Sequence, residues 1–304
     1  MTEISTGTAF SKIDAALALS PLYTEFRLGL LDVATYQRWV ENEGLASVPT
    51  LNEDQINLSA RFPRNKHDFV RRALAQCRAV DILPDDSYDA DASESALKRM
   101  DERFDHGRYL TYIFPEESAL LYAVVNIVQP RRIAFLGSYY GYWAAAAAAA
   151  PSKQGIDLIL VDIDPDSMEM ARHNLEKQGL SDNKATAFLV DDAEALAAAP
   201  APELREIDIL VLDAEGPKSD DVPPDYRDKA IYYPHLRASL AELQPGALVV
   251  AHNVILSNFT TSAYFEEKQQ NYRQQYTKFL ALIRENFVYT VIDSTEGVLI
   301  ARKL

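Results

Sequence analysis

The spacing of hydrophobic residues changes along the chain near residue 130. Before that point, apolar residues recur at helical intervals, as at Phe26 and Leu30, and polar and apolar positions almost never alternate. Helical intervals are typical of amphipathic helices, whereas alternation is typical of strands. From Arg131 onward, short β-rich runs take turns with helical segments. The pattern therefore predicts a helical N-terminal domain over residues 1–128 and an α/β domain over residues 129–304.

Seven runs in the second domain have the β-branched and aromatic composition of strands. Helical segments separate the first five runs, and such alternation produces parallel strands joined by helices on both faces of a sheet. The last two runs are separated only by 294–297, a hairpin-sized turn. We predict an α/β fold with a Rossmann-like, doubly wound sheet of seven strands and a terminal antiparallel hairpin. The strands are expected at 133–136, 158–162, 187–190, 209–212, 247–251, 289–293 and 298–301, and the helices between the first five at 144–150, 166–178, 192–198 and 233–243.

Two other segments have helical spacing of their own. The segment 24–40 is predicted to be a helix with exposed apolar surface. The segment 266–282 is predicted to be an amphipathic helix with Tyr272, Tyr276 and Phe279 on one face. We expect these three aromatic residues to pack in the core.

Composition excludes several classes of protein. The chain has 304 residues, of which 48% are hydrophobic and 25% charged, and this is typical of globular proteins, not of disordered or fibrous ones. Its formal net charge of −15 and isoelectric point near 4.8 would repel the phosphates of nucleic acid, whose binding depends on lysine and arginine. The expected partners are therefore small molecules and not nucleic acid.

Two observations concern the location of the protein. The only cysteine, Cys77, lies in an apolar helical stretch and is predicted to be a core residue. The first thirty residues lack a basic segment followed by an apolar run, and no run of about 18 apolar residues occurs. We expect a cytoplasmic protein without a membrane partner.

Glycines and acidic residues follow the first three predicted strands, at the ends where doubly wound sheets bind ligands. Gly137 and Gly141 follow the first strand and allow a sharp turn close to a ligand. Asp162 ends the second strand, where a carboxylate can accept hydrogen bonds from ribose hydroxyls. Asp191 and Asp192 follow the third strand, where a carboxylate can bind the exocyclic amine of adenine. The structural alternatives are a ligand-free turn at the glycines and a helix cap after the third strand.

In this order, these features resemble the class I S-adenosylmethionine (SAM) methyltransferases, particularly the catechol O-methyltransferase-like branch. The resemblance covers 114–304 and includes the fourth-strand motif 210–214 and the fifth-strand run 243–253. It implies that SAM is the cofactor or the substrate itself. The residues that the resemblance places around SAM are Gly137, Ser138, Tyr139, Gly141, Asp162, Ile163, Asp191, Asp192 and Asp213.

Several positions depart from that branch. Phe135 stands where an acidic residue usually contacts the methionine part of SAM. Asp213, His252 and Asn253 stand where metal-dependent relatives hold a divalent ion with two aspartates and an asparagine. An imidazole in place of an oxygen ligand suits magnesium poorly, so no metal is expected. The lysine that serves those enzymes as a base has only Lys218 as a counterpart.

The loop 138–143 is unusually aromatic and contains Tyr139, Tyr140, Tyr142 and Trp143. One interpretation is ordinary packing of these rings. The other is that tyrosine rings surround the sulfonium of SAM, which a cation–π contact stabilises. A site of the second kind needs neither a metal nor a strong base.

The second interpretation, together with the run 133–138 and the helical N-terminal domain, resembles the nicotianamine synthases and the azetidine-2-carboxylate synthases. Both move the aminocarboxypropyl arm of SAM. The resemblance implies closure of that arm to azetidine-2-carboxylate, with release of methylthioadenosine, in natural product biosynthesis. In this hypothesis Asp213 orients the amine, and positioning within one molecule supplies most of the rate. The residues expected around the reacting atoms are Tyr112, Tyr139, Tyr140, Tyr142 and Asp213.

Two alternatives stay open. A metal-independent small-molecule O- or N-methyltransferase would use Asp213, His252 or Lys218 as a base and produce S-adenosylhomocysteine (SAH). A non-catalytic SAM-binding module would consume nothing. Methylthioadenosine formed from SAM alone would distinguish the ring closure. The helical domain, with Tyr112 near its end, is predicted to be either a lid over the pocket or the dimerisation surface of a homodimer.

Overall fold

The computed structural model describes residues 7–180, 186–198, 204–256 and 262–304. Its centre is a seven-stranded sheet with the strand order β5-β4-β3-β6-β7-β9-β8. All seven predicted strands are present. Their bounds are β3 (Arg132–Leu136), β4 (Asp157–Asp162), β5 (Thr186–Val190), β6 (Ile207–Leu212), β7 (Leu243–Ala251), β8 (Phe287–Ile292) and β9 (Val298–Lys303).

The pairing of these strands matches the predicted doubly wound sheet with a terminal hairpin. β3 is parallel to β4 on one side and to β6 on the other, and β5 and β7 extend the parallel region. β9 is antiparallel to both β7 and β8. The winding of the sheet reverses between β3 and β6, so a ligand is expected beyond the ends of these strands.

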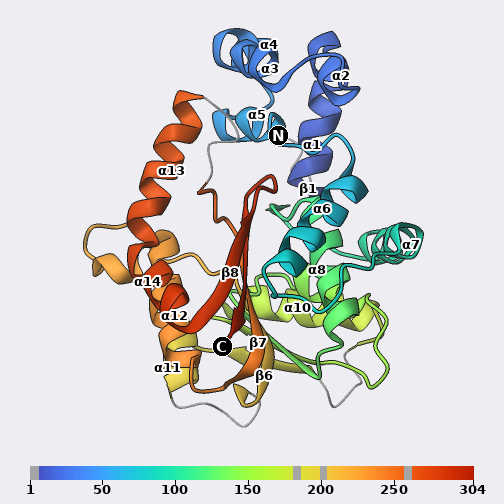
Figure 1. Ribbon diagram of the computed structural model, residues 1–304. Coiled ribbons are helices and arrows are strands. Elements are labelled where there is room, and N and C mark those ends of the chain that lie inside the picture. Colours follow the sequence, from blue (N-terminus) through green and yellow to red (C-terminus); the bar gives the residue numbers. More distant parts are fainter. Residues whose placement is uncertain (1–6, 181–185, 199–203, 257–261) are drawn as a thin grey trace.

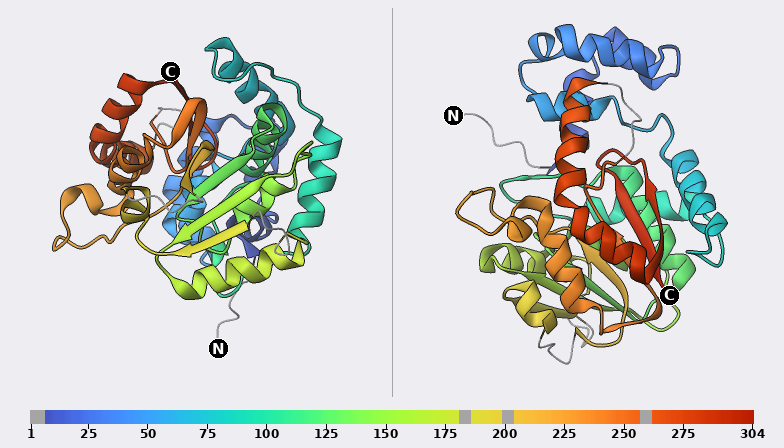
Figure 2. Two further views of the ribbon diagram at one scale, coloured as in Figure 1. Left: turned by 90° about the horizontal axis from the view of Figure 1, so that it is seen from below. Right: turned by 60° about the vertical axis from the view of Figure 1, so that its left-hand side comes forward.

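Helices lie on both faces of the sheet (Figure 2). Alternate residues of a strand point to opposite faces, and Ile133 and Phe135 of β3 accordingly belong to one hydrophobic cluster, whereas Ala134 and Leu136 belong to another. Cys77 is completely buried in the first cluster, as predicted. No described helix is long and apolar enough to cross a bilayer. The first face is covered by α6 (Lys66–Ala79), α7 (Ala90–Asp101), α8 (Pro115–Val128), α9 (Tyr142–Ala148) and α10 (Pro165–Lys177), and the second by α11 (Ala193–Ala198), α12 (Tyr232–Ser239) and α14 (Thr277–Asn286).

Packing divides the predicted N-terminal domain in two. α6, α7 and α8 share the core of the sheet, while the preceding helices have a hydrophobic cluster of their own, joined by Phe114, Ile255 and Phe265. These preceding helices lie beyond the tip of the β8–β9 hairpin (Figure 1). A separate helical domain over residues 1–128 therefore stays a prediction, as does its role. The remaining elements before the sheet are β1 (Gly7–Thr8), α1 (Ala9–Leu17), α2 (Pro21–Arg27), α3 (Val33–Trp39), η1 (Val40–Gly44), α4 (Leu45–Ser47), α5 (Glu53–Ser59) and β2 (Leu110–Thr111).

The predicted helix over 24–40 is wrong, because this segment contains the end of α2 and the whole of α3. Gly29 between them has a φ of +78°, which interrupts a helix. Asp32 then caps α3, since its side chain accepts a hydrogen bond from the Thr35 N–H at 2.9 Å. Two short helices replace one long one.

The predicted helix over 266–282 is also divided, into α13 (Ala263–Gln275) and α14. The break lies at Tyr276, which has φ −83° and ψ 3° and donates a hydrogen bond from its hydroxyl to the Asn253 carbonyl at 3.0 Å. Tyr276 and Phe279 are buried in the core, as predicted. The break lets α14 follow the sheet while α13 extends past it (Figure 1).

The predicted helix over 233–243 is too long. α12 ends at Ser239, and β7 begins at Leu243, because Ile207 pairs with Leu243 and Ile209 with Leu248 across an irregularity in the register. Gly246 within the irregularity has a φ of +83°, which no helix accommodates. Two short 3₁₀ elements precede α12, namely η3 (Pro224–Tyr226) and η4 (Asp228–Ile231).

Candidate active site

The loop after β3 turns sharply beside the end of β6. Gly137 has a φ of +83°, and a Cβ atom at this position would overlap with the backbone of Ala214. Glycine is therefore required by conformation and by space. Tyr139 also has a positive φ, +47°, and its N–H donates to Oδ2 of Asp162 at 2.8 Å. The loop is thus attached to the end of β4.

Asp162 has a second backbone partner and still has capacity for a ligand. Its Oδ1 accepts a hydrogen bond from the Asp164 N–H at 3.2 Å. Burial raises the pKa of Asp162, although the backbone N–H groups act in the opposite direction. A carboxylate has about four lone-pair sites, so Asp162 can still accept a hydrogen bond from a ligand. The next residue, Ile163, has an exposed fraction of 73%.

The helix-cap alternative after the third strand is confirmed for one aspartate. Asp192 accepts a hydrogen bond from the Ala195 N–H at 2.8 Å and so caps α11. Asp191 accepts one from the Asp192 N–H at 2.7 Å. Both residues nevertheless line the cavity described next, so capping does not prevent either from binding a ligand.

One cavity of about 1610 Å³ lies at the ends of the parallel strands. It brings residues from the sheet together with Tyr112, which precedes α8. Gly141 is the exception among the predicted site residues, because it is buried at the start of α9, where a Cβ atom would lie 3.3 Å from Ala171, and it does not line the cavity. The predicted residues that line the cavity are Tyr112, Gly137, Ser138, Tyr139, Tyr140, Tyr142, Asp162, Ile163, Asp191, Asp192 and Asp213.

The tyrosines of the aromatic loop have different surroundings. The rings of Tyr139 and Tyr140 are stacked, with centroids 3.9 Å apart and planes inclined by 10°. The Tyr142 hydroxyl donates to Asp101 of α7 at 2.9 Å, and the Tyr142 ring packs edge-on against Phe104. Tyr142 therefore attaches α9 to α7 through its side chain, whereas Tyr139 and Tyr140 are hydrogen-bonded to Asp162 and Asn174 through their backbone atoms.

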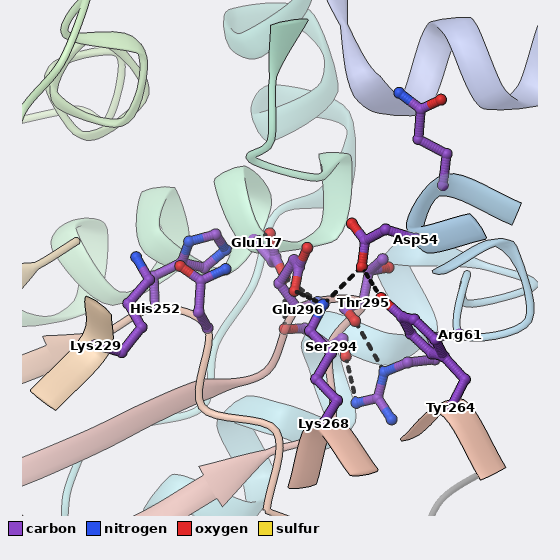
Figure 3. A network of polar contacts seen from close by, with 12 residues as sticks. Asp54, Arg61, Glu117, Lys229, His252, Tyr264, Lys268, Ser294, Thr295 and Glu296 are labelled. Carbon is purple, nitrogen blue, oxygen red and sulfur yellow. Dashed lines mark hydrogen bonds and ion pairs between the residues drawn. The ribbon is translucent and has the colours of Figure 1, made fainter. Parts of the chain in front are cut away.

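A chain of three side chains runs from the end of β6 to α8. Nδ1 of His252 lies 3.0 Å from Oδ1 of Asp213, and Nε2 of His252 lies 3.1 Å from Oε2 of Glu117. Figure 3 shows His252 facing Glu117. Burial lowers the pKa of His252, but the charges of Asp213 and Glu117 outweigh burial and raise it to about 10. The ring is therefore protonated at neutral pH and donates from both nitrogens.

Lys229 places a second cation beside Asp213. Its side chain is buried, and Nζ lies 3.6 Å from Oδ1 of Asp213. Lys218, the predicted counterpart of a catalytic lysine, is instead paired with Glu215 at 2.7 Å, and 70% of its side chain is exposed. The lysine next to the carboxylate is therefore Lys229, which the sequence pattern did not identify.

Glu117 is fixed by the turn of the last hairpin. Its Oε1 accepts hydrogen bonds from the Ser294 hydroxyl at 2.7 Å and from the Glu296 N–H at 2.9 Å. Burial by itself would raise the pKa of Glu117, but His252 outweighs burial and keeps this pKa low. For the adjacent Glu116, burial and then the charge of Glu117 raise the pKa to about 7. Two adjacent carboxylates inside an apolar helix were the available sequence signal, because buried charges need partners.

A second charged network lies at one end of the cavity (Figure 3). Lys268 of α13 lies 2.9 Å from Asp54 of α5 and 3.4 Å from Glu296. Arg61 donates to the carbonyl oxygen of Thr295 at 2.8 Å. The network joins the N-terminal helices, α13 and the hairpin turn, and none of its members was predicted.

The positions that correspond to metal ligands do not fit a metal ion. Both ring nitrogens of His252 are in hydrogen bonds with carboxylates, so neither has a free lone pair. The ammonium of Lys229 lies beside Asp213, and two positive groups next to one carboxylate repel a divalent cation. In the described segments of the chain, no group of three or more His, Cys, Asp or Glu side chains has the arrangement of a metal site.

Comparisons with known proteins agree with this fold. A family model described as O-methyltransferase matches residues 90–304. The SAH-bound methyltransferase PaMTH1 of Podospora anserina has a similar fold, with a TM-score of 0.50 and 16% identity over 78% of this chain and 96% of that one. A methyltransferase of Geobacter sulfurreducens has a TM-score of 0.46 and 23% identity over 72% of this chain and 91% of that one. No curated protein sequence matches the chain.

Proposed function

We propose that this chain, which belongs to the O-methyltransferase family through its match over residues 90–304, transfers the methyl group of SAM to a hydroxyl oxygen of a small molecule. The oxygen bonds to the methyl carbon, the carbon–sulfur bond breaks, the hydroxyl proton passes to a base, and the sulfonium becomes the neutral sulfur of SAH. The family match supports this alternative better than closure of the aminocarboxypropyl arm.

The residues at the strand ends support SAM as the methyl donor. Asp162 has lone pairs for the ribose hydroxyls, and Asp191, which is predicted to bind adenine, borders the same cavity. Gly137 keeps side-chain atoms out of the turn, so that the backbone can approach the ligand. The stacked rings of Tyr139 and Tyr140 provide aromatic surface for the sulfonium.

The size of the cavity is the observation that favours transfer to a second molecule. Its volume is about 1610 Å³, whereas pockets for one drug-sized ligand measure roughly 300–1000 Å³. Ring closure within SAM requires space for one ligand. Methyl transfer requires space for a donor and an acceptor side by side, and the cavity is large enough for both.

Asp213 is the base in this proposal. Its Oδ1 is occupied by His252 and faces Lys229, which leaves Oδ2 for the proton of the acceptor. His252 carries a proton on each nitrogen at neutral pH, because its pKa is raised to about 10 by the flanking carboxylates in spite of its burial. It is therefore a positioning residue. The Lys229 ammonium stabilises negative charge as it develops on the acceptor oxygen.

No divalent metal is needed for this reaction. His252 and Lys229 supply positive charge on the side of Asp213 where a metal would otherwise do so. We expect methyl transfer to continue at an unchanged rate in the presence of EDTA. Loss of activity in EDTA that returns on addition of Mg²⁺ would contradict this expectation.

The reaction type is tested by the product that SAM yields. The purified chain is incubated with SAM alone and with SAM plus a panel of phenols, and nucleoside products are separated by chromatography. We expect SAH, and only when an acceptor is present. Methylthioadenosine formed without an acceptor would support ring closure and overturn methyl transfer.

The role of Asp213 is tested by the substitution Asp213→Asn. We expect kcat to fall about 100-fold or more, because general-base catalysis contributes roughly 10²–10⁴, while SAH binding measured by calorimetry changes little. Asp221→Asn is the matched control, since Asp221 is exposed and lies outside the cavity wall. An Asp213→Asn enzyme with unchanged kcat would exclude Asp213 as the base.

A further inference from the structure

The wall of the cavity is strongly acidic. The described residues that line it include ten carboxylates but only three lysines, and no arginine. Charges of one sign in a partly enclosed space focus their field, so they attract cations and repel anions. SAM carries a positive sulfonium and is compatible with this field. The same field acts on the acceptor.

The acidic residues are not confined to the predicted SAM site. Glu53, Asp54, Glu267 and Glu296 line the end of the cavity formed by α5, α13 and the hairpin turn. Among the described lysines of the wall, Lys268 contacts two of these carboxylates, those of Asp54 and Glu296. This end of the cavity therefore has an excess of negative charge of its own, apart from the carboxylates at the ends of β4 and β5.

The protein already holds an alkylammonium group at this end. Nζ of Lys268 lies between the two carboxylates and also 5.8 Å and 6.0 Å from the ring centroids of Tyr264 and Tyr272. Carboxylates combined with aromatic ring faces are a common arrangement for binding ammonium groups. Tyr112 lines the cavity nearby, with its hydroxyl accepting a hydrogen bond from Gln55 of α5 at 2.9 Å. The surroundings thus suit an amine on an aromatic molecule.

A hydrogen-bond donor without a partner lies near His252 and Asp213. Trp143 lines the cavity with an exposed fraction of only 5%, and its Nε1–H has no hydrogen-bond partner among the described residues. Its ring centroid lies 5.1 Å from that of His252. A buried N–H without a partner is destabilising, so Trp143 carries an unmet hydrogen-bonding requirement next to His252.

These two regions are joined by a single side chain. Glu117 contacts His252 with Oε2 at 3.1 Å and accepts the Glu296 N–H with Oε1 at 2.9 Å. The two regions are thus connected inside the protein through Glu117.

On the basis of the proposed function, we propose that the acceptor is a small phenol that carries a protonated amine. Its hydroxyl lies near Asp213, its ring lies among the tyrosines, and its ammonium lies at the end of the cavity that Glu53, Asp54, Glu267 and Glu296 line. Acceptors with a carboxylate or a phosphate are repelled by the same residues.

Three phenols of similar size test this proposal: tyramine, 4-propylphenol and 3-(4-hydroxyphenyl)propionate, which differ in the charge of the side chain. Binding of each is measured by calorimetry to the SAH-loaded chain, and turnover is measured as SAH formed from SAM. We expect tyramine to bind about tenfold more tightly than 4-propylphenol, as a contact of the ammonium with rings and carboxylates implies. We expect the propionate to bind most weakly. Equal affinities, or tighter binding of the propionate, would overturn the proposal.

Two variants test which part of the cavity binds the amine. Glu296→Gln and Glu267→Gln are expected to reduce the ratio of tyramine to 4-propylphenol affinity several-fold, and Glu267 is exposed, so its replacement leaves the fold intact. Glu266→Gln is the matched control, because Glu266 lies on the same helix but outside the cavity wall. An unchanged ratio in both variants would overturn the assigned place of the amine.

If SAH binds but no phenol does, the acceptor proposal alone fails. If SAH does not bind, the proposed function fails with it.

Discussion

At Gly137 the backbone has a φ of +83° and passes so close to Ala214 that no side chain fits. Gly155 offers a comparison, because its φ is +80° but nothing lies within 4 Å of the place where a Cβ atom would be. The first glycine is constrained by conformation and by space, and the second by conformation alone. A comparison of Gly137 with Gly155 therefore separates the effect of backbone conformation from the effect of limited space.

Gly137→Ala is expected to lower the free energy of unfolding by about 2–4 kcal/mol, as for other substitutions that force backbone shifts, and to weaken SAH binding. Gly155→Ala is expected to lower it by only about 1 kcal/mol, which is the order of the strain of a positive φ. Urea unfolding and calorimetry with SAH measure both effects. Equal losses in the two variants would contradict the close approach at Ala214.

The raised pKa of His252 predicts how the stability of the fold depends on pH. Asp213 and Glu117 outweigh the effect of burial and raise its pKa from 6.5 to about 10. A pKa that is higher in the folded state contributes stability that is complete below the unfolded value and is lost as pH rises through the folded value. His252→Gln is therefore expected to be less stable than the parent at pH 6, with the difference shrinking toward pH 10. Urea unfolding at several pH values tests this, and a difference that stays constant would contradict it.

Residues of the site were predictable where their signals are local. Gly137 directly follows the first predicted strand and Asp162 ends the second, and the structure places both at one cavity. Glu117 and His252 are 135 positions apart and meet only through the folded sheet. Lys229 likewise reaches Asp213 from η4, so chain spacing pointed to the exposed Lys218 instead.

The turn between β8 and β9 forms hydrogen bonds with residues that are far from it in the sequence. Arg61, which is buried, donates to the Ser294 and Thr295 carbonyl oxygens, each at 2.8 Å. Its guanidinium also lies over the Phe265 ring, 5.3 Å from the centroid. The hairpin is thus attached to the segment that follows α5.

Arg61→Met is expected to lower the free energy of unfolding by about 3 kcal/mol, because two carbonyl oxygens lose charged donors and Asp293 and Glu296 lose a nearby cation. Arg64→Met is the control, since Arg64 is exposed three residues later. Thermal and urea unfolding of both variants provide the measurement. Similar stability of the two variants would show that Arg61 does not hold the hairpin.

The strands were predictable because alternation and β-branched composition are properties of short runs. The errors lie where backbone conformation overrides periodicity. Gly29 ends α2, Tyr276 divides α13 from α14, and the irregularity at Gly246 extends β7 into a predicted helix. In each case the hydrophobic spacing continues across the break, so the pattern gave no sign of it.

For the whole molecule, charge is the feature with the widest effect. The formal net charge of −15 has the same sign as the excess of carboxylates in the cavity. Both fields should attract a cationic substrate and be screened by salt, whose Debye length is about 10 Å at 0.1 M.

If the acceptor carries an amine, its KM is expected to rise several-fold when NaCl increases from about 0.02 M to about 0.5 M, because screening weakens attraction between tyramine and the carboxylates. The KM of the neutral 4-propylphenol should change little over the same range. Steady-state rates at several salt concentrations provide the test. Parallel changes for both phenols would indicate a general effect of salt on the enzyme.

The attachment of the hairpin turn also bears on how the chain folds as it leaves the ribosome. Glu116 and Glu117 find their partners 177 and 179 positions later, in the turn, and Arg61 finds its partners 233 and 234 positions later. A nascent chain that has emerged as far as β7 already contains these charges without the groups that compensate them. We therefore expect the N-terminal helices and α8 to reach their final arrangement only after the last hairpin has been synthesised.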